Sequence, residues 1–436
     1  MAHVRGESVV DPVDARADST GGWRALVNRA GWGIADQALS SLTNFALGIL
    51  VARSASPEEF GAFTIVFATF ILALGLARAL SGEPLLVRHT EAPNPDLRRA
   101  TASATGAAIA IGAVAGLGCV VAGVAARGGL GDAFVALGIL LPWLLLQDGW
   151  RYAFFAAGRS KAAFANDLIW AALLLPVLVL ISGTRTVSAR DLILVWGTTA
   201  ALAAAAGIFQ ARVIPDPRGT IRWIRGHRDL APRYVGEYMA ASGAYQFSAY
   251  GVAAVASLAA VAALRAGQLL LGPLNIFGLA AGVAAVPEFV RISRRRPAAV
   301  RKASVALSAG MVAVATLWGS VLLLLPARVN ELALGPQWAG ASLVLLPLVL
   351  ARLGSGAQAG PSTALRALGE ARRSLLLRAV CAAVVAFGTI GGAATGGALG
   401  AASALAAAEC IGAVLWWWQI LVVTGSRRRT QTGRSQ

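Results

Sequence analysis

The sequence predicts an all-α polytopic membrane protein of about 12 transmembrane helices, arranged as two six-helix bundles with a central cavity. Three observations predict this fold class: an apolar composition, an uneven distribution of positive charge among the loops, and a similarity between the two halves. Hydrophobic residues make up 57% of the 436-residue chain and charged residues only 14%, whereas soluble domains carry about 25% charged residues. The surplus apolar surface is therefore expected to face lipid.

Twelve segments contain the roughly 20 mostly apolar residues that a membrane-spanning helix needs. They cover residues 31–52, 60–80, 100–124, 131–157, 162–182, 190–211, 233–256, 264–290, 300–325, 338–358, 372–392 and 398–421. This pattern predicts a disordered cytoplasmic tail (1–29), a first bundle (30–211), a basic cytoplasmic linker (212–232), a second bundle (233–424) and a basic cytoplasmic tail (425–436).

The distribution of Lys and Arg predicts the orientation, because loops rich in these residues stay in the cytoplasm. With the N-terminus inside, 28 of the 38 basic residues fall in predicted cytoplasmic segments and five in predicted outside loops. Both termini are then cytoplasmic, and the protein is expected to be a multi-pass protein of the cytoplasmic (inner) membrane. Topology thus accounts for the net charge of +17, and no nucleic-acid partner is expected.

A weak internal repeat predicts the division into two halves. The segment Ile71–Arg88 has six identities in eighteen positions with Leu274–Arg291. Both segments lie in the second predicted helix of their half and leave the membrane on the cytoplasmic side. Parallel repeats of this kind are common in transporters, which bind substrate between the halves.

Polar and charged residues inside predicted membrane helices are costly there and are functional candidates. They are concentrated on the first, second, seventh and eighth helices, at matching places in the two halves. The candidate substrate-cavity residues are Asp36, Gln37, Asn44, Arg78, Asp148, Arg151, Glu237, Gln246, Arg265, Gln268 and Asn275.

Two interpretations of these residues stay open. In the first, they line a cavity that holds an anionic, hydroxyl-rich headgroup through arginines and polar side chains. In the second, charges near helix ends reach the membrane interface or pair with one another. For Asp148 and Arg151, three positions apart on one helix face, a structural ion pair is an equally good interpretation.

Several other kinds of site are not predicted. The three Cys and three His residues form no cluster with metal-ligand spacing, so no metal site is expected. No GxxxxGK[ST] motif is present and all outside loops are short, so neither an ATPase nor a membrane enzyme with an external catalytic domain is expected. We therefore expect no cofactor and no enzymatic activity.

One stretch of sequence supports a family resemblance. ADQALSSLTNFALGILVARSASPEEFGAFTIVF, at Ala35–Phe67, resembles the N-terminal signature of polysaccharide flippases of the O-antigen and teichoic acid exporter type. These belong to the multidrug/oligosaccharidyl-lipid/polysaccharide flippase superfamily, which also holds lipid II flippases and multidrug and toxic compound extrusion transporters. Further similar segments are Gly82–Arg88, Gln147–Trp170 and Leu264–Asn275.

The resemblance implies a transporter that moves a polyprenyl-linked oligosaccharide or polysaccharide precursor by alternating access. It also implies that Arg265 lies near the cavity. Our hypothesis is that Arg265, and with it Arg78, holds the diphosphate, and that Asp36 or Glu237 couples transport to a proton. The chain ends after twelve helices, which favours the polysaccharide branch over lipid II flippases. The implied partners are the lipid bilayer, the lipid-linked glycan, a proton or sodium ion, and glycan assembly enzymes.

Two alternatives to this function remain. A cation-coupled exporter of small molecules would favour an acidic or aromatic cavity, whereas the candidate residues here include several arginines. A transporter-like scaffold for glycan assembly enzymes would not need its cavity charges at all.

Overall fold

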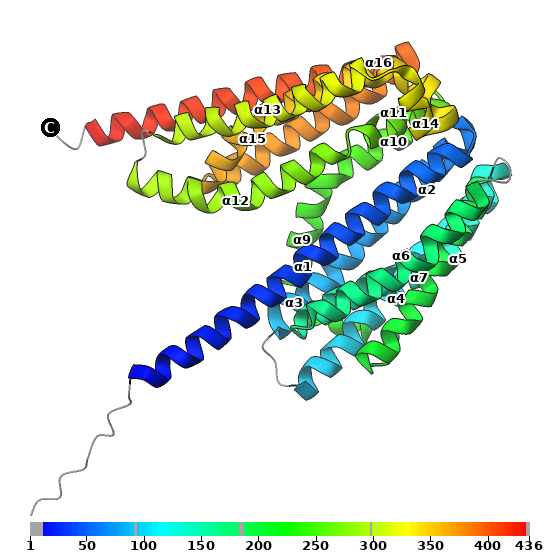
Figure 1. Ribbon diagram of the computed structural model, residues 1–436, viewed down its shortest axis with the longest axis horizontal. Coiled ribbons are helices and arrows are strands. Elements are labelled where there is room, and N and C mark those ends of the chain that lie inside the picture. Colours follow the sequence, from blue (N-terminus) through cyan, green and yellow to red (C-terminus); the bar gives the residue numbers. More distant parts are fainter. Residues whose placement is uncertain (1–11, 91–93, 183–186, 297–298, 433–436) are drawn as a thin grey trace, which may run out of the picture.

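The computed structural model describes residues 12–90, 94–182, 187–296 and 299–432, and all regular elements in these ranges are helices (Figure 1). The first half contains α1 (Pro12–Ser54), α2 (Pro57–Ala77), the π-helical turn η1 (Arg78–Gly82), α3 (Glu83–His89), α4 (Asn94–Ala126), α5 (Gly128–Ala156), α6 (Ser160–Ser182) and α7 (Ala189–Ala211). The connection contains η2 (Pro217–Gly219) and α8 (Thr220–Gly226). The second half contains α9 (Ala231–Tyr238), η3 (Met239–Gly243), α10 (Ala244–Val255), α11 (Leu258–Leu270), α12 (Pro273–Arg295), α13 (Val300–Leu324), α14 (Ala327–Leu334), η5 (Gly335–Gln337), α15 (Trp338–Ala367) and α16 (Ala371–Thr432).

Each of the twelve predicted segments coincides with a helix or a bent pair of helices. Nine helices in the described part of the chain are long and apolar enough to cross a membrane. The predicted seventh and eighth segments are not among these nine. The seventh contains α9, η3 and α10, the eighth contains most of α11 and α12, and the last two predicted segments are merged within α16.

The helix α16 folds back on itself. Gly396 and Gly397 have non-helical dihedral angles, with φ of −137° and 56° respectively. A Cβ atom added at Gly392 would lie 2.3 Å from the carbonyl oxygen of Gly400, so the two arms of the hairpin touch through glycine backbone. The 54-residue, largely apolar stretch Arg372–Gly425 therefore forms two antiparallel helices, as the sequence predicts.

Replacing Gly397 by alanine is expected to destabilise this hairpin by about 1–3 kcal/mol, because only glycine readily adopts its dihedral angles. Gly396 provides the matched control, since its φ of −137° is open to any residue and nothing lies within 4 Å of a Cβ at either position. Thermal unfolding of the detergent-purified protein should show a lower midpoint for G397A than for G396A. Equal midpoints would contradict the assigned backbone conformation.

One predicted helix end is wrong. Helix α15 ends at Ala367 and not at residue 358, although Pro361 lies inside it. Pro361 leaves the carbonyl of Ala357 without its helical donor. The hydroxyl of Ser308 and the indole N–H of Trp417 donate to that carbonyl at 2.8 and 3.0 Å, so the helix continues.

Residues 1–11 of the predicted N-terminal tail (1–29) lie outside the described residues. Residues 12–29 belong to α1, which begins at Pro12. Extending a helix that is already nucleated costs little, and this stretch contains several Ala, Arg and Leu residues with high helix propensity.

The two halves approach each other at one end and diverge toward the end at which the chain starts and finishes (Figure 1). At the close end α2 packs against α11, where a Cβ at Gly61 would lie 2.0 Å from the carbonyl oxygen of Leu258. Gln337 also donates a hydrogen bond of 2.9 Å to the carbonyl of Ala55 there. The contact between the halves is thus concentrated where α1 turns into α2.

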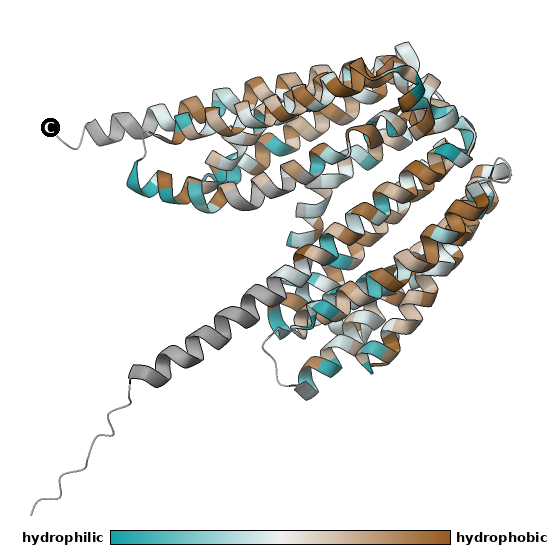
Figure 2. Ribbon diagram, viewed as in Figure 1, coloured by the Kyte–Doolittle hydropathy of each residue, from teal (hydrophilic) through white to brown (hydrophobic). Residues whose placement is uncertain are grey.

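The outer faces of the helices carry large apolar side chains, and Figure 2 shows apolar residues along most of their length. Leu117, Phe209, Leu324 and Phe387 are 65–83% exposed. Exposed apolar surface on this scale marks contact with lipid. The protein is therefore a multi-pass membrane protein.

The connection between the halves, which contains η2 and α8, packs against the first half and forms hydrogen bonds with it. Trp223 is buried and its indole N–H donates to the carbonyl of Leu80 at 3.1 Å. Arg88 donates to the carbonyl of Gly226 at 2.8 Å and pairs with Asp229 at 2.6 Å. A backbone hydrogen bond and the Arg88 guanidinium hold the pKa of the Asp229 carboxyl below its usual value.

Candidate substrate cavity

A network of charged residues joins four elements inside the first half. Arg78, at the start of η1, forms a bidentate pair with Asp148 of α5 at 2.6 and 2.9 Å. Arg151 of α5 lies 3.0 Å from a carboxyl oxygen of Asp36 in α1 and also hydrogen-bonds to Asp167 in α6. Asp148 and Arg151 thus find their partners on other helices, and we call these five residues the first-half charge cluster.

The first-half charge cluster contains three carboxylates and two guanidinium groups, which leaves one unbalanced negative charge if all five groups are ionised. Asp36 is 1% exposed, and its Oδ1 atom has no hydrogen-bond partner in the described part of the chain. Such an oxygen is costly to bury. A proton on this carboxyl, or a bound cation, would remove both the excess charge and the unsatisfied oxygen.

A second polar region lies between the halves. A cavity of about 310 Å³ is enclosed by α2, α10, α11 and α16. Of the predicted residues, Gln246, Arg265 and Gln268 line it, together with Thr64 and Thr389. We call this space the central cavity.

Arg265 is the only charged residue among the described residues that line the central cavity. Its guanidinium lies 5.9 Å from the centre of the Phe67 ring, a cation–π contact. Within the described chain it makes no hydrogen bond and no ion pair. A half-buried cation in a membrane protein is normally paired, so the central cavity presents an unsatisfied positive charge.

Three other predicted residues, Gln37, Asn44 and Asn275, do not line the central cavity. Gln37 and Asn44 are exposed on α1, and Gln37 donates a hydrogen bond to Ser41 at 3.4 Å. Asn275 lines a different pocket, between α12, α13 and α15. The side chain of Glu237 lies outside the part of the structure that is described.

The sequence analysis missed one acidic site in the second half. Glu409 of α16 is buried and accepts hydrogen bonds from Tyr245 at 2.6 Å and from Gln358 at 2.7 Å. These residues border a cavity of about 220 Å³ that Arg378 also lines. Glu409 could have been selected from the sequence, because it is a carboxylate inside an alanine-rich membrane segment. Asp36 was selected as a candidate because it is a charged residue inside a predicted membrane helix, and the same criterion applies to Glu409.

Among the described residues, no group of three or more His, Cys, Asp or Glu has an arrangement that would bind a metal ion. The three described cysteines are free thiols. The polar regions of the molecule are thus suited to hydrogen bonding and to ion pairing.

Taken together, the helices form a polytopic membrane protein of two bundles with a polar cavity between them. No protein-family profile and no curated protein matches the sequence. Solved structures do match. An inward-facing multidrug resistance MATE family transporter of the MOP superfamily has a TM-score of 0.66 at 15% identity, over 91% of this chain and 99% of that one.

A second similar structure is lipid II flippase MurJ in an inward closed conformation. It has a TM-score of 0.67 at 12% identity, over 89% of this chain and 87% of that one. At these identities the likeness shows the fold. The predicted fold class is therefore confirmed, and the chain shares its architecture with transporters of the MOP superfamily.

Proposed function

We propose that the protein is a membrane transporter that moves a polyprenyl-linked oligosaccharide or polysaccharide precursor across the cytoplasmic membrane by alternating access. The observation that carries this proposal is Arg265, an unpaired cation in the cavity between the two halves. The similarity to MATE and MurJ structures supports the transporter class. The N-terminal sequence signature supports the polysaccharide branch.

The chemistry of the central cavity favours an anionic, hydroxyl-rich substrate. A guanidinium binds phosphate oxygens through charge-assisted hydrogen bonds. Gln246 and Gln268 provide amides, and Thr64 and Thr389 provide hydroxyls, that can bind sugar hydroxyls. The described lining contains no carboxylate, which argues against a cationic drug as the main substrate.

The first-half charge cluster is a candidate coupling site. Its unbalanced negative charge and the unsatisfied Oδ1 of Asp36 favour uptake of one proton or one small cation. We propose that this uptake favours one of the two arrangements of the halves.

In our proposed topology the N-terminal bundle (30–211) and the C-terminal bundle (233–424) move about the linker (212–232), and both termini are cytoplasmic.

Replacing Arg265 by alanine is expected to slow transport at least tenfold, because the charge-assisted hydrogen bonds it would lose are worth about 1.5–3 kcal/mol. Arg265→Lys keeps the charge without the planar fork and should retain part of the activity. The assay is a proteoliposome containing a fluorescent, short-chain polyprenyl diphosphate oligosaccharide. It measures how fast this lipid becomes accessible to a membrane-impermeant reagent.

Arg190→Ala is the matched control, since this arginine is exposed at the start of α7. It should transport at the wild-type rate. Wild-type protein that moves an organic cation but no lipid-linked glycan would overturn the proposal in favour of a small-molecule exporter. Wild-type protein that moves neither would favour a scaffold.

A further inference from the structure

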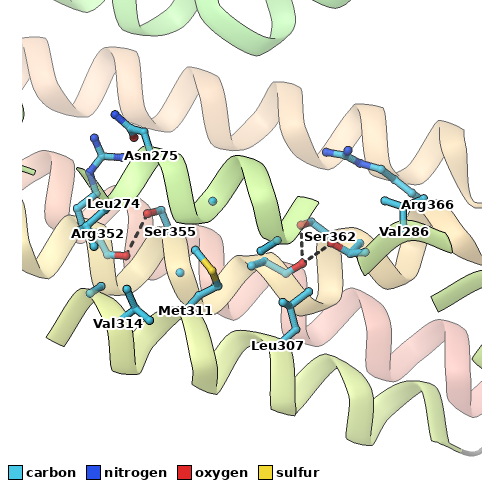
Figure 3. A pocket seen from close by; sticks show the side chains of 16 residues that line it. Leu274, Asn275, Val286, Leu307, Met311, Val314, Arg352, Ser355, Ser362 and Arg366 are labelled. Carbon is cyan, nitrogen blue, oxygen red and sulfur yellow. Dashed lines mark hydrogen bonds between the residues drawn. The ribbon is translucent and has the colours of Figure 1, made fainter. Parts of the chain in front are cut away.

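A separate pocket lies within the second half, between α12, α13 and α15 (Figure 3). Its volume is about 310 Å³, at the lower end of the range for ligand pockets. None of its lining residues lines the central cavity. It is therefore separate from the central cavity, although it shares Ser355, Ala359 and Ser362 with the cavity beside Glu409. We call it the α12–α13–α15 groove.

The groove is long and has a cation at each end. Figure 3 shows Arg352 beside Asn275 at one end and Arg366 at the other. Both arginines belong to α15, and their spacing in sequence corresponds to roughly 21 Å along a helix. The groove thus extends for about four helical turns.

One wall of the groove between the two arginines is apolar. Leu307, Met311 and Val314 of α13 line this side, and Val286 of α12 lies near Arg366 (Figure 3). The α15 wall carries hydroxyl side chains, those of Ser355, Ser362 and Thr363, and the described lining contains no carboxylate. The groove thus combines an apolar wall with a hydroxyl-bearing, positively charged wall.

Arg352 lies near the middle of α15, which extends from Trp338 to Ala367. Its side chain is half-buried, and within the described chain its guanidinium has no hydrogen bond and no ion pair. A cation at mid-helix in a membrane protein is costly unless an anion accompanies it. The described lining of the groove contains no carboxylate, so an anionic ligand would balance this charge.

We propose that the α12–α13–α15 groove binds a lipid phosphate, with the phosphate at Arg352 and the hydrocarbon chain along Leu307, Met311 and Val314. The amide of Asn275 is placed to donate a further hydrogen bond to the phosphate. Arg366 is exposed near the end of α15, where it attracts anionic headgroups from the membrane surface. An amphipathic anion satisfies both the charge and the apolar wall, whereas a small inorganic anion would leave the wall in contact with water.

This site does not depend on the proposed transport function, because it shares no residue with the central cavity. The same chemistry occurs in two sources, an anionic phospholipid of the bilayer and a polyprenyl phosphate carrier. Binding of either one fills the groove as proposed.

The test is photolabelling of the full-length protein in nanodiscs with a phosphatidylglycerol that carries a diazirine in its acyl chain, followed by mass spectrometry of peptides. Label is expected on the peptide of α13 that contains Met311. Labelling should fall about tenfold or more in Arg352→Gln, because a charge-assisted hydrogen bond is lost, and should fall also in Arg366→Gln. Unlabelled short-chain polyprenyl phosphate, added as competitor, shows which source binds better.

Two control variants keep the test specific. Arg372→Gln removes an exposed arginine at the start of α16, and Arg265→Gln removes the central-cavity cation; both should label like the wild type. Met311→Trp should fill the α12–α13–α15 groove without changing any charge, and so it should lower the labelling. This variant serves as the test if Arg352→Gln fails to fold. Unchanged labelling in Arg352→Gln and Met311→Trp would overturn the proposal. So would labelling that disappears in Arg265→Gln, or protection by inorganic phosphate without any lipid labelling.

Discussion

Replacing Arg151 by methionine is expected to lower the free energy of unfolding by about 3–5 kcal/mol, the usual cost of removing one partner from a buried ion pair. Arg151 is 12% exposed and pairs with both Asp36 and Asp167, whose side chains are 1% and 6% exposed. Methionine matches the length of the arginine stem but leaves these two carboxylates without a cation. Buried, unpaired carboxylates either take up protons or destabilise the fold.

Thermal unfolding of the detergent-purified protein, followed by the fluorescence of its 12 tryptophans, measures this effect. The triple variant R151M/D36N/D167N should recover much of the lost stability, because it removes the charges as well as their partner. Arg99→Met is the control, since Arg99 is 81% exposed and pairs with Asp96 on the surface at 3.3 Å. If R151M unfolds at the same temperature as Arg99→Met, the cluster does not stabilise the first half.

The second large effect is expected at the contact between the halves. Gly61→Leu should prevent the close approach of α2 to α11, because a Cβ at this position would lie 2.0 Å from the carbonyl oxygen of Leu258. Backbone atoms of both helices would have to separate, and the halves would no longer close at this end. The transport that we propose should then be abolished, since alternating access requires this end to close in every cycle.

The separation of the two halves at this end can be measured through the reactivity of an introduced cysteine. Ala55→Cys, in a background without the three native cysteines, places a thiol at a position that is fully buried in the structure. Adding Gly61→Leu should make this thiol react with a membrane-impermeant maleimide. Gly118→Leu is the matched control, because nothing lies within 4 Å of a Cβ there. A thiol that stays protected in the Gly61→Leu variant would show that the halves tolerate the added side chain.

The positions of the helices were predictable because hydropathy and length are local properties of a sequence. The segment predicted at 300–325, for example, is α13 at Val300–Leu324. The end of α15 was not predictable, since it depends on donors from two other helices, Ser308 and Trp417, that satisfy the carbonyl freed by Pro361.

The partners of the charged residues were the least predictable part of the candidate site. The spacing of Asp148 and Arg151 is compatible with a pair on one helix, but each pairs with residues of other elements. Which helices are neighbours is a property of the packed bundle, and no spacing within one segment encodes it. Arg265 was easier to place because a family resemblance, and not its spacing, associated it with the cavity.

The docked connection between the halves has a consequence for how they stay together. Trp223 and Asp229 bind the connection to the first half. The covalent link to the second half is therefore only the short stretch of chain that follows Leu230. In α9, Tyr238 then donates to the carbonyl of Ile71 at 2.6 Å. A tether this short keeps one half at a high effective concentration around the other. In the alternating-access cycle that we propose, this tether would keep the two halves close together while their interface opens.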